Sequence, residues 1–280
     1  MNARRNWMLA LFALALAAAK SETLTEPATS EYAAVLKQYV DGRGMVDYKG
    51  LQANRQPLDR YVSSLAALAP PSYEKWTKEK KIAFWLNAYN GLTLRAIVDH
   101  YPIKKGGLIS GLRFPNNSIR QIPGAWDQLR FTVMGRQMTL DQMEHEVLRK
   151  QFNEPRIHMA LVCAAKGCPP LRDEPYAGDR LDAQLSDQAR TSLSNPERLR
   201  IDRKKNSVHL SSIFKWFGAD FAGKYTTDQF TQQPKDVRPV LAFVSHYAGP
   251  RDAGYLKTGK YYIEYLDYDW SLNEQARGTR

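Results

Sequence analysis

The residues best suited to chemistry lie between residues 140 and 172. Cys163 is one of only two cysteines, and the second, Cys168, follows five positions later. The mainly apolar run from Arg156 to Cys163 predicts a β-strand that ends at a turn of small residues. A strand end of this kind exposes a nucleophile. The position favours Cys163 as the nucleophile of a hydrolase or an acyl transferase.

Two histidines are candidates for the base that such a thiol needs. His158 belongs to the same predicted strand as Cys163. Five residues of strand span roughly 16 Å, and the odd spacing points the two side chains to opposite faces. His158 can therefore serve Cys163 only if the strand is broken between them. His145, on the preceding predicted helix, is at least as good a candidate, and the sequence leaves both open.

Glu144 is an unusual residue within the predicted helix that follows Thr139. It lies inside the apolar stripe of that helix, where a carboxylate needs a cation or several donors, or else takes up a proton. One interpretation is a structural salt bridge to Arg149, Arg156 or Arg172. The other is a general acid or base at a site.

Three further polar residues could orient a catalytic imidazole. Asn87 and Asn90 belong to a predicted helix over residues 74–101 that is apolar nearly all round and is therefore buried. Their amides need partners, because an unpaired buried amide costs about 1–3 kcal/mol. They either tie neighbouring loops to the core or line a site. Asp269, in a predicted strand over residues 261–270, either orients a histidine or makes a turn hydrogen bond.

The two cysteines admit more than one state. Cysteines in an oxidising compartment pair more often than not, which favours a Cys163–Cys168 disulfide. Its small loop would contribute only about 2 kcal/mol. A free, reactive Cys163 and a redox-active pair remain as alternatives. The Cys-x4-Cys spacing has no second such pair and the chain has five histidines, so we predict no metal site and no cofactor.

The first residues predict export. Arg4 and Arg5 precede an uncharged apolar run, residues 7–19, that ends in three alanines, the pattern of a secretory signal peptide over residues 1–19. The run is shorter than the roughly 20 residues that span a bilayer. We expect a periplasmic or secreted protein with no stable membrane span after cleavage.

The rest of the chain predicts one helix-rich domain. Residues 20–30 are polar and predict a disordered lead-in, 31–275 a single globular domain, and 276–280 a tail. Predicted helices cover 31–40, 58–68, 74–101 and 181–193, and others begin at residues 139, 212 and 235; predicted strands cover 131–138, 156–163, a hairpin around residue 205, and 261–270. This pattern favours an α+β fold with a small, mostly antiparallel sheet.

The charge of the chain bears on its partners. The formal net charge of +11 favours loose attraction to acidic envelope polymers. The basic cluster over residues 198–205 is accounted for by the solvated tip of the predicted hairpin. Net charge is the one feature that points to a nucleic acid, so we expect no nucleic acid as a partner.

Several unusual motifs occur in order along the chain. They are Val46-Asp-Tyr48, Ala83 to Asn90, Ser118-Ile119, Leu140 to Arg149, Pro155 to Cys163 with Cys168 to Leu171, Trp216 with Asp220-Phe221, and Tyr268 to Asn273. With these motifs the chain resembles the bacterial, exported branch of the domain-of-unknown-function 547 family. The resemblance implies an envelope protein and brings no accepted activity. The plant relatives do not reliably keep the position of Cys168, which favours a role for Cys163 that needs no disulfide.

Two functional hypotheses follow. In the first, an envelope hydrolase or acyl transferase uses Cys163 as nucleophile, His145 or His158 as base, Asn87, Asn90 or Asp269 as orienting group and Glu144 as a buried organiser. In the second, the protein is a non-enzymatic envelope binding module with a structural disulfide, and the long loop over residues 104–124 with nearby Trp126 contacts the partner. That partner is an unknown envelope component or a small substrate, and the sequence leaves open whether the protein is an enzyme.

Overall fold

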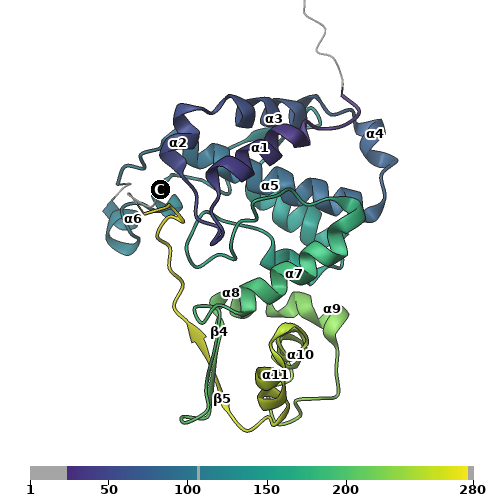
Figure 1. Cartoon of the computed structure of the whole chain (residues 1–280), viewed down its shortest axis with the longest axis vertical. Helices are drawn as coiled ribbons and strands as arrows, with labels where there is room; N and C mark the ends of the chain where they lie inside the picture. The colour runs from purple at the N-terminus through teal and green to yellow at the C-terminus, as the bar shows by residue number, and fades with distance from the viewer. Residues whose placement is uncertain (1–23, 106–107, 277–280) are drawn as a thin grey trace, which may run out of the picture.

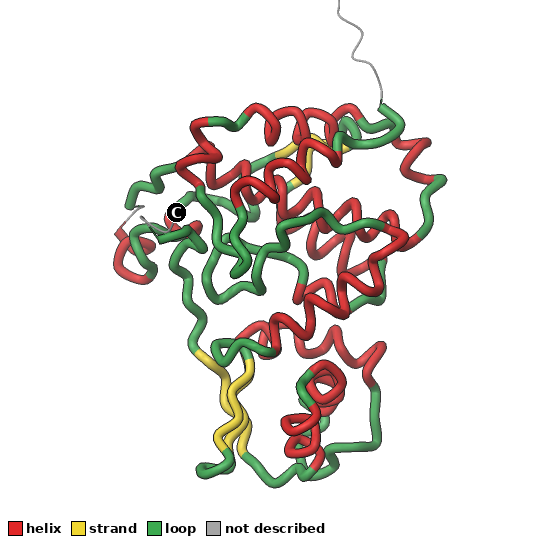
Figure 2. The backbone as a smooth tube through the Cα atoms, viewed as in Figure 1, coloured by secondary structure: helices red, strands yellow, loops and turns green. Residues whose placement is uncertain are grey.

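The computed structural model describes residues 24–105 and 108–276. Helices α1 to α5 gather at one end of the molecule, and strands β4 and β5 with helices α10 and α11 form the other end (Figure 1). Figure 2 shows how strongly helices outnumber strands. The predicted α+β class is confirmed.

Helices make up most of the described chain. The α-helices are α1 (Thr29–Tyr39), α2 (Tyr48–Ala53), α3 (Gln56–Ala67), α4 (Pro70–Glu74), α5 (Lys78–His100), α6 (Leu108–Arg113), α7 (Leu181–Leu193), α8 (Ser212–Phe217), α9 (Ala222–Tyr225), α10 (Arg238–Tyr247) and α11 (Pro250–Lys257). The 3₁₀ helices are η1 (Ile119–Gln121), η3 (Pro155–Met159), η4 (Gly178–Arg180) and η5 (Gly218–Phe221), and η2 (Gln142–Arg149) is a π-helix.

The strands form two small sheets. They are β1 (Phe131–Val133), β2 (Arg136–Met138), β3 (Leu199–Asp202), β4 (Ser207–Ser211) and β5 (Tyr262–Leu266). The hairpin β1–β2 and the pair β3–β4 are antiparallel, as predicted, but β5 pairs with β4 in parallel. Helices α8 to α11 lie between β4 and β5 in the chain, which gives the long crossover that a parallel pair requires.

Helix α5 organises the larger part of the core. It begins after Thr77, whose hydroxyl accepts a hydrogen bond from the Lys80 amide, and it is buried almost continuously from Ile82 to Val98. Gly91 allows helix α3 to approach closely, because a Cβ there would lie 2.6 Å from the ring of Tyr61. The helix therefore forms a rigid wall for the segments that carry the candidate site.

The predicted strand over residues 156–163 was wrong. Residues Pro155–Met159 form the 3₁₀ helix η3, which Pro155 opens and in which the Glu154 side chain accepts a hydrogen bond from the Arg156 amide. A local cap and a proline therefore outweigh the alternating apolar pattern that predicted a strand. The prediction that His158 and Cys163 point to opposite faces of one strand is therefore wrong as well.

Other boundaries differ from the predictions. Helix α1 begins at Thr29, and Leu24 pairs with Leu68, so the described part of the predicted lead-in is held against the fold. The predicted loop over residues 104–124 contains α6 and η1. Residues 1–19, the predicted signal peptide, lie outside the described residues. Among the residues described, no helix is long and apolar enough to cross a membrane.

Candidate functional site

A cavity of about 540 Å³ lies where the two clusters of the hydrophobic core meet. Glu144, His145, His158 and Cys163 all line it. Tyr268 also lines it and packs against both core clusters. The structure thus brings four of the seven predicted site residues to one cavity, although they come from separate segments.

The π-helix η2 supplies the first two of these residues. A capping box opens this segment, since the Thr139 amide donates to Gln142 Oε1 (3.0 Å) and the Gln142 amide donates to Thr139 Oγ1 (3.2 Å). The helix that follows carries Glu144 and His145 into the cavity. π-Helical turns are rare and concentrate at functional sites, so this geometry itself marks the segment.

Glu144 is buried without the salt bridge that the sequence favoured. In the described chain, Arg149, Arg156 and Arg172 each pair with other carboxylates. The partner of Glu144 is instead the hydroxyl of Tyr89. Burial raises the pKa of Tyr89 well above its ordinary value, and the charge of Glu144 and the hydrogen bond to it raise that pKa further. The phenol therefore keeps its proton and donates to the carboxylate.

His145 has a tautomer fixed by its neighbour. Arg149 Nη1 lies 3.0 Å from His145 Nδ1, and a guanidinium can only donate. The Nδ1 atom therefore accepts, and the proton of the ring lies on Nε2, which is 3.9 Å from Asp141 Oδ1. His145 presents an N–H group rather than a free lone pair, so it is suited to donate a hydrogen bond and poorly placed to act as a base.

His158 differs from His145, because its hydrogen-bond partner is a carboxylate rather than a guanidinium. Its Nε2 atom lies 2.8 Å from Asp220 Oδ2, and its ring stacks on Phe217 with centroids 4.4 Å apart. Arg149 binds both oxygens of Asp220, at 2.6 and 2.9 Å. Burial opposes ionisation of Asp220, but hydrogen bonds from Arg149 and His158 outweigh it and hold the pKa well below its ordinary value. The carboxylate therefore accepts a hydrogen bond from Nε2, so Nδ1 is the ring nitrogen that Asp220 does not bind.

The Asp220 network predicts a specific loss of stability in acid. A carboxyl whose pKa is depressed by folding stabilises the protein above its unfolded pKa, here near 3.8, and this contribution is lost as the pH falls toward the folded value. The free energy of unfolding of Asp220→Asn should therefore fall less steeply below pH 4 than that of the wild type. Urea titrations between pH 6 and pH 2 measure it. Asp269→Asn is the control, and equal slopes for Asp220→Asn and the wild type would contradict the assignment.

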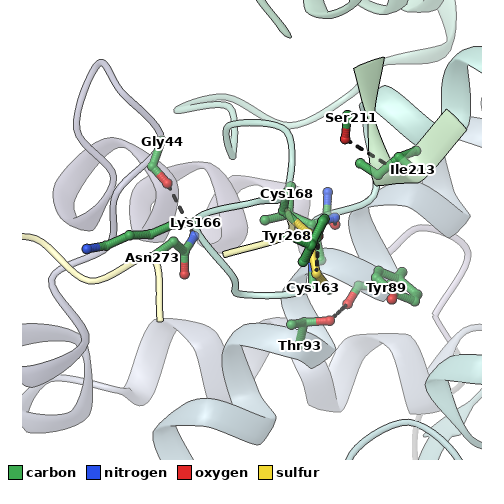
Figure 3. The surroundings of a disulfide bond; sticks show 12 residues. Gly44, Tyr89, Thr93, Cys163, Lys166, Cys168, Ser211, Ile213, Tyr268 and Asn273 are labelled. Carbon is green, nitrogen blue, oxygen red and sulfur yellow. Dashed lines mark hydrogen bonds between the residues drawn. A yellow bond between two sulfur atoms is a disulfide. The ribbon is translucent and has the colours of Figure 1, made fainter. Parts of the chain in front are cut away.

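Cys163 and Cys168 form a disulfide at the wall of the cavity (Figure 3). The Tyr268 hydroxyl lies 3.1 Å from Cys163 Sγ and donates to Cys168 Sγ at 3.0 Å. Burial raises the pKa of Tyr268, so the hydroxyl stays protonated beside both sulfur atoms. Within the described residues, no group of three or more histidine, cysteine or acidic side chains could hold a metal ion.

The remaining predicted residues lie outside the cavity. Asn90 holds the segment before Cys163, because its amide donates to the Ala160 carbonyl (3.0 Å) and accepts from the Val162 amide (2.9 Å). Asn87 makes the equivalent pair of bonds to the backbone of Tyr176. Both therefore tie loops to helix α5 rather than orient an imidazole.

Asp269 likewise serves the backbone. It follows the end of β5 at Leu266, and its carboxylate accepts a hydrogen bond from the Ser271 amide at 2.8 Å. The chain around it runs beside the disulfide loop, where the Gly167 amide donates to the Asp269 carbonyl and the Lys166 amide donates to the Ser271 carbonyl. These bonds hold the C-terminal segment against the cavity.

That segment completes an aromatic wall. Tyr268 and Trp270 have ring centroids 4.6 Å apart, and Trp216 lies 4.9 Å from Tyr268 and 6.1 Å from Trp270. Trp126 reaches Trp270 from the other side at 6.1 Å. Trp216 is 47% exposed, which is unusual for so large an apolar side chain. The wall gives the cavity an aromatic surface suited to the apolar part of a ligand.

Comparison with known proteins adds a family. Residues 73–192 match the family described as a protein of unknown function, DUF547. The matched residues include Glu144, His145, His158 and Cys163, so the predicted resemblance to this family is confirmed, while its bacterial, exported branch stays a prediction. No curated protein and no solved structure gives a significant match to the chain.

Several site residues escaped prediction. Trp216 and Tyr268 lie beyond residues 73–192 and line the cavity, whereas Asp220, also beyond them, does not line it but binds His158, which does. Asp220 is separated from His158 by 62 positions. The only sequence signal for these residues was their place in the motifs Asp220-Phe221 and Tyr268 to Asn273. Arg120 had no signal beyond its position in the long loop.

Proposed function

We propose that the protein is an exported cell-envelope enzyme, a hydrolase or acyl transferase, whose nucleophile is the reduced thiol of Cys163. One observation carries the proposal: Cys163 shares a cavity with His158, and Asp220 orients that histidine through Nε2, so that Nδ1 is the nitrogen it does not bind. A nucleophile, a base and a group that orients the base are the three parts that acyl transfer by a thiol requires.

The residues assign the proton movements. The Cys163 thiol gives its proton to His158 Nδ1, and the thiolate attacks a carbonyl carbon of the substrate. The tetrahedral intermediate collapses, and the leaving amine or alcohol takes the proton back from His158. Water or a second acceptor then attacks the thioester, which releases the acid or a transferred acyl group. The Tyr268 hydroxyl, beside Cys163 Sγ, is a donor available to the developing oxyanion.

The thiol has to be generated from the disulfide. We infer that a dithiol reductant of the envelope transfers two electrons and two protons to the Cys163–Cys168 bond and is itself oxidised to a disulfide. Cys163 is partly exposed to the cavity whereas Cys168 is buried. Attack by the reductant is therefore expected at Cys163, with the Cys168 sulfur as leaving group.

The proposed location rests on two features. Residues 1–19 have the pattern of a secretory signal, and the two cysteines are paired, as is common outside the cytosol. Bacterial export of this chain therefore remains part of the proposal. Fractionation of cells that express the full chain, with mass spectrometry of the mature N-terminus, tests it.

A trapping experiment tests the thiol. The Cys168→Ala variant has a single thiol at Cys163, and we expect it to gain one acetyl group from p-nitrophenyl acetate at that residue. The Cys163→Ala variant retains the buried Cys168 and is expected to gain none. Intact-mass and peptide mass spectrometry at neutral pH measure both. Equal acetylation of the two variants, or none in either, would overturn the proposal.

The second candidate is a binding module with a structural disulfide. The disulfide itself favours it, and so does Arg198, whose guanidinium donates to the carbonyl of Cys168 and fixes the loop. Here the aromatic cavity would bind an envelope component without chemistry. Protein isolated from the envelope whose Cys163 is fully disulfide-bonded and resists mild reduction would favour this candidate and exclude the first.

A further inference from the structure

The guanidinium of Arg120 lies among aromatic rings at the cavity. Its central carbon lies 4.2 Å from the ring centroid of Trp270, 5.0 Å from that of Trp126 and 5.1 Å from that of Phe114. Contacts with three rings restrict where the guanidinium can lie. The side chain also lines the cavity, so its N–H groups can meet a ligand there.

In the described part of the chain no carboxylate forms an ion pair with this cation, although the charge of Asp141, on the same cavity, attracts it. The backbone amide of Arg120 donates a hydrogen bond to the Ser118 hydroxyl. Burial lowers the pKa of Arg120 from its ordinary value, and the neighbouring charge of Arg113 adds to this effect. Arg156 and Arg172, in contrast, each bind two carboxylates. The N–H groups of the Arg120 guanidinium are therefore not bound by a carboxylate of the described residues.

The surrounding charges restrict which anion fits. Asp127 and Asp141 also line the cavity, and burial together with the charge of Asp127 raises the pKa of Asp141 despite the opposing effects of His145 and Arg120. A dianionic phosphate would be repelled by these acids more strongly than a monoanionic carboxylate. The aromatic wall beside Arg120 suits an apolar portion of the same ligand.

We propose that Arg120 binds a carboxylate group of the ligand, and that the cavity therefore takes acyl compounds with a free carboxylate next to an apolar portion. The inference deepens the proposed function, because it names the substrate class of the same cavity. A bidentate bond from a pre-oriented guanidinium to a carboxylate is strong and geometrically specific. Binding of the carboxylate does not require the thiol, so it can be tested without turnover.

Tryptophan fluorescence provides the test, because Trp126 and Trp270 contact Arg120. The full mature chain is titrated with cyclohexanecarboxylate and with cyclohexanecarboxamide, which have the same shape but differ in charge. We expect the carboxylate to bind at least about tenfold more tightly than the amide, since hydrogen bonds to charged groups are the stronger ones. Equal binding of the two compounds would overturn the proposal.

Variants locate the effect at Arg120. Arg120→Gln should abolish the preference for the carboxylate, and Arg120→Lys should keep only part of it because the planar fork is lost. Arg113→Gln is the matched control, since Arg113 stacks on Phe114 but does not line the cavity. An unchanged preference in Arg120→Gln, or tighter binding of inorganic phosphate than of the carboxylate, would refute the assignment.

Discussion

The His158→Gln variant is expected to lose on the order of 100-fold in the rate at which the Cys163 thiol is acetylated by p-nitrophenyl acetate, in a Cys168→Ala background. Glutamine keeps a donor toward Asp220 but has no lone pair that can take up the thiol proton at neutral pH. The rate is measured by release of p-nitrophenol. Raising the pH to 9 should recover much of the difference, because the thiol then ionises without a base.

His145→Gln is the matched control for this experiment. In the wild type, the ring nitrogen Nδ1 of His145 accepts a hydrogen bond from Arg149, so His145 lacks the free lone pair that a base requires. We expect its acetylation rate to stay within a few-fold of that of the parent. A large loss of rate in His145→Gln, together with no loss in His158→Gln, would show that His145 is the base. That outcome would overturn the proposed proton path.

The Arg156→Ala variant is expected to lose about 3 kcal/mol of unfolding free energy. Arg156 is only 6% exposed and binds both oxygens of Glu154, each at 2.7 Å. Removal of the guanidinium leaves the Glu154 carboxylate buried, with Lys224 at 2.7 Å and the backbone amide of residue 156 at 3.2 Å as partners. Urea denaturation measures the loss as a lower midpoint with an unchanged slope.

An exposed pair of the same geometry separates burial from pairing. Arg60 binds both oxygens of Glu31, at 2.7 and 2.9 Å, but its side chain is 55% exposed. Arg60→Ala should therefore lower the free energy of unfolding far less than Arg156→Ala does. Equal losses in the two variants would show that the buried position of Arg156 adds nothing to the value of its ion pair.

Elements that depend on neighbouring residues could be predicted from the sequence. The capping box of Thr139 and Gln142 needs only its own four residues, and the hairpin β1–β2 needs only a short alternating run. The burial of Asn87 and Asn90 followed from a helix that is apolar nearly all round. Their partners, Tyr176 and the backbone before Cys163, could not be predicted because they depend on how distant segments pack.

The sequence predicted the reactive residues of the candidate site but not how they are arranged in space. The apolar alternation around His158 predicted a strand, whereas a proline and a local cap produce a 3₁₀ helix, and this reversed the argument against His158 as the base. Residues 142–149 have an ordinary helical pattern, and nothing in it indicates a π-helix. The carboxylate that orients His158 comes from Asp220, and no local pattern links two residues so far apart.

Much of the aromatic wall comes from a different part of the chain than the proposed nucleophile and base. The proposed nucleophile and base lie within residues 73–192, while Trp216, Tyr268 and Trp270 belong to the last third of the chain and are carried by α8 and the C-terminal segment. Changes at Trp216 or Trp270 can alter which molecules enter, whereas Tyr268 and Phe217 contact the disulfide and His158 directly. Duplicated copies of such a chain are thereby free to diverge in specificity while they retain one reaction.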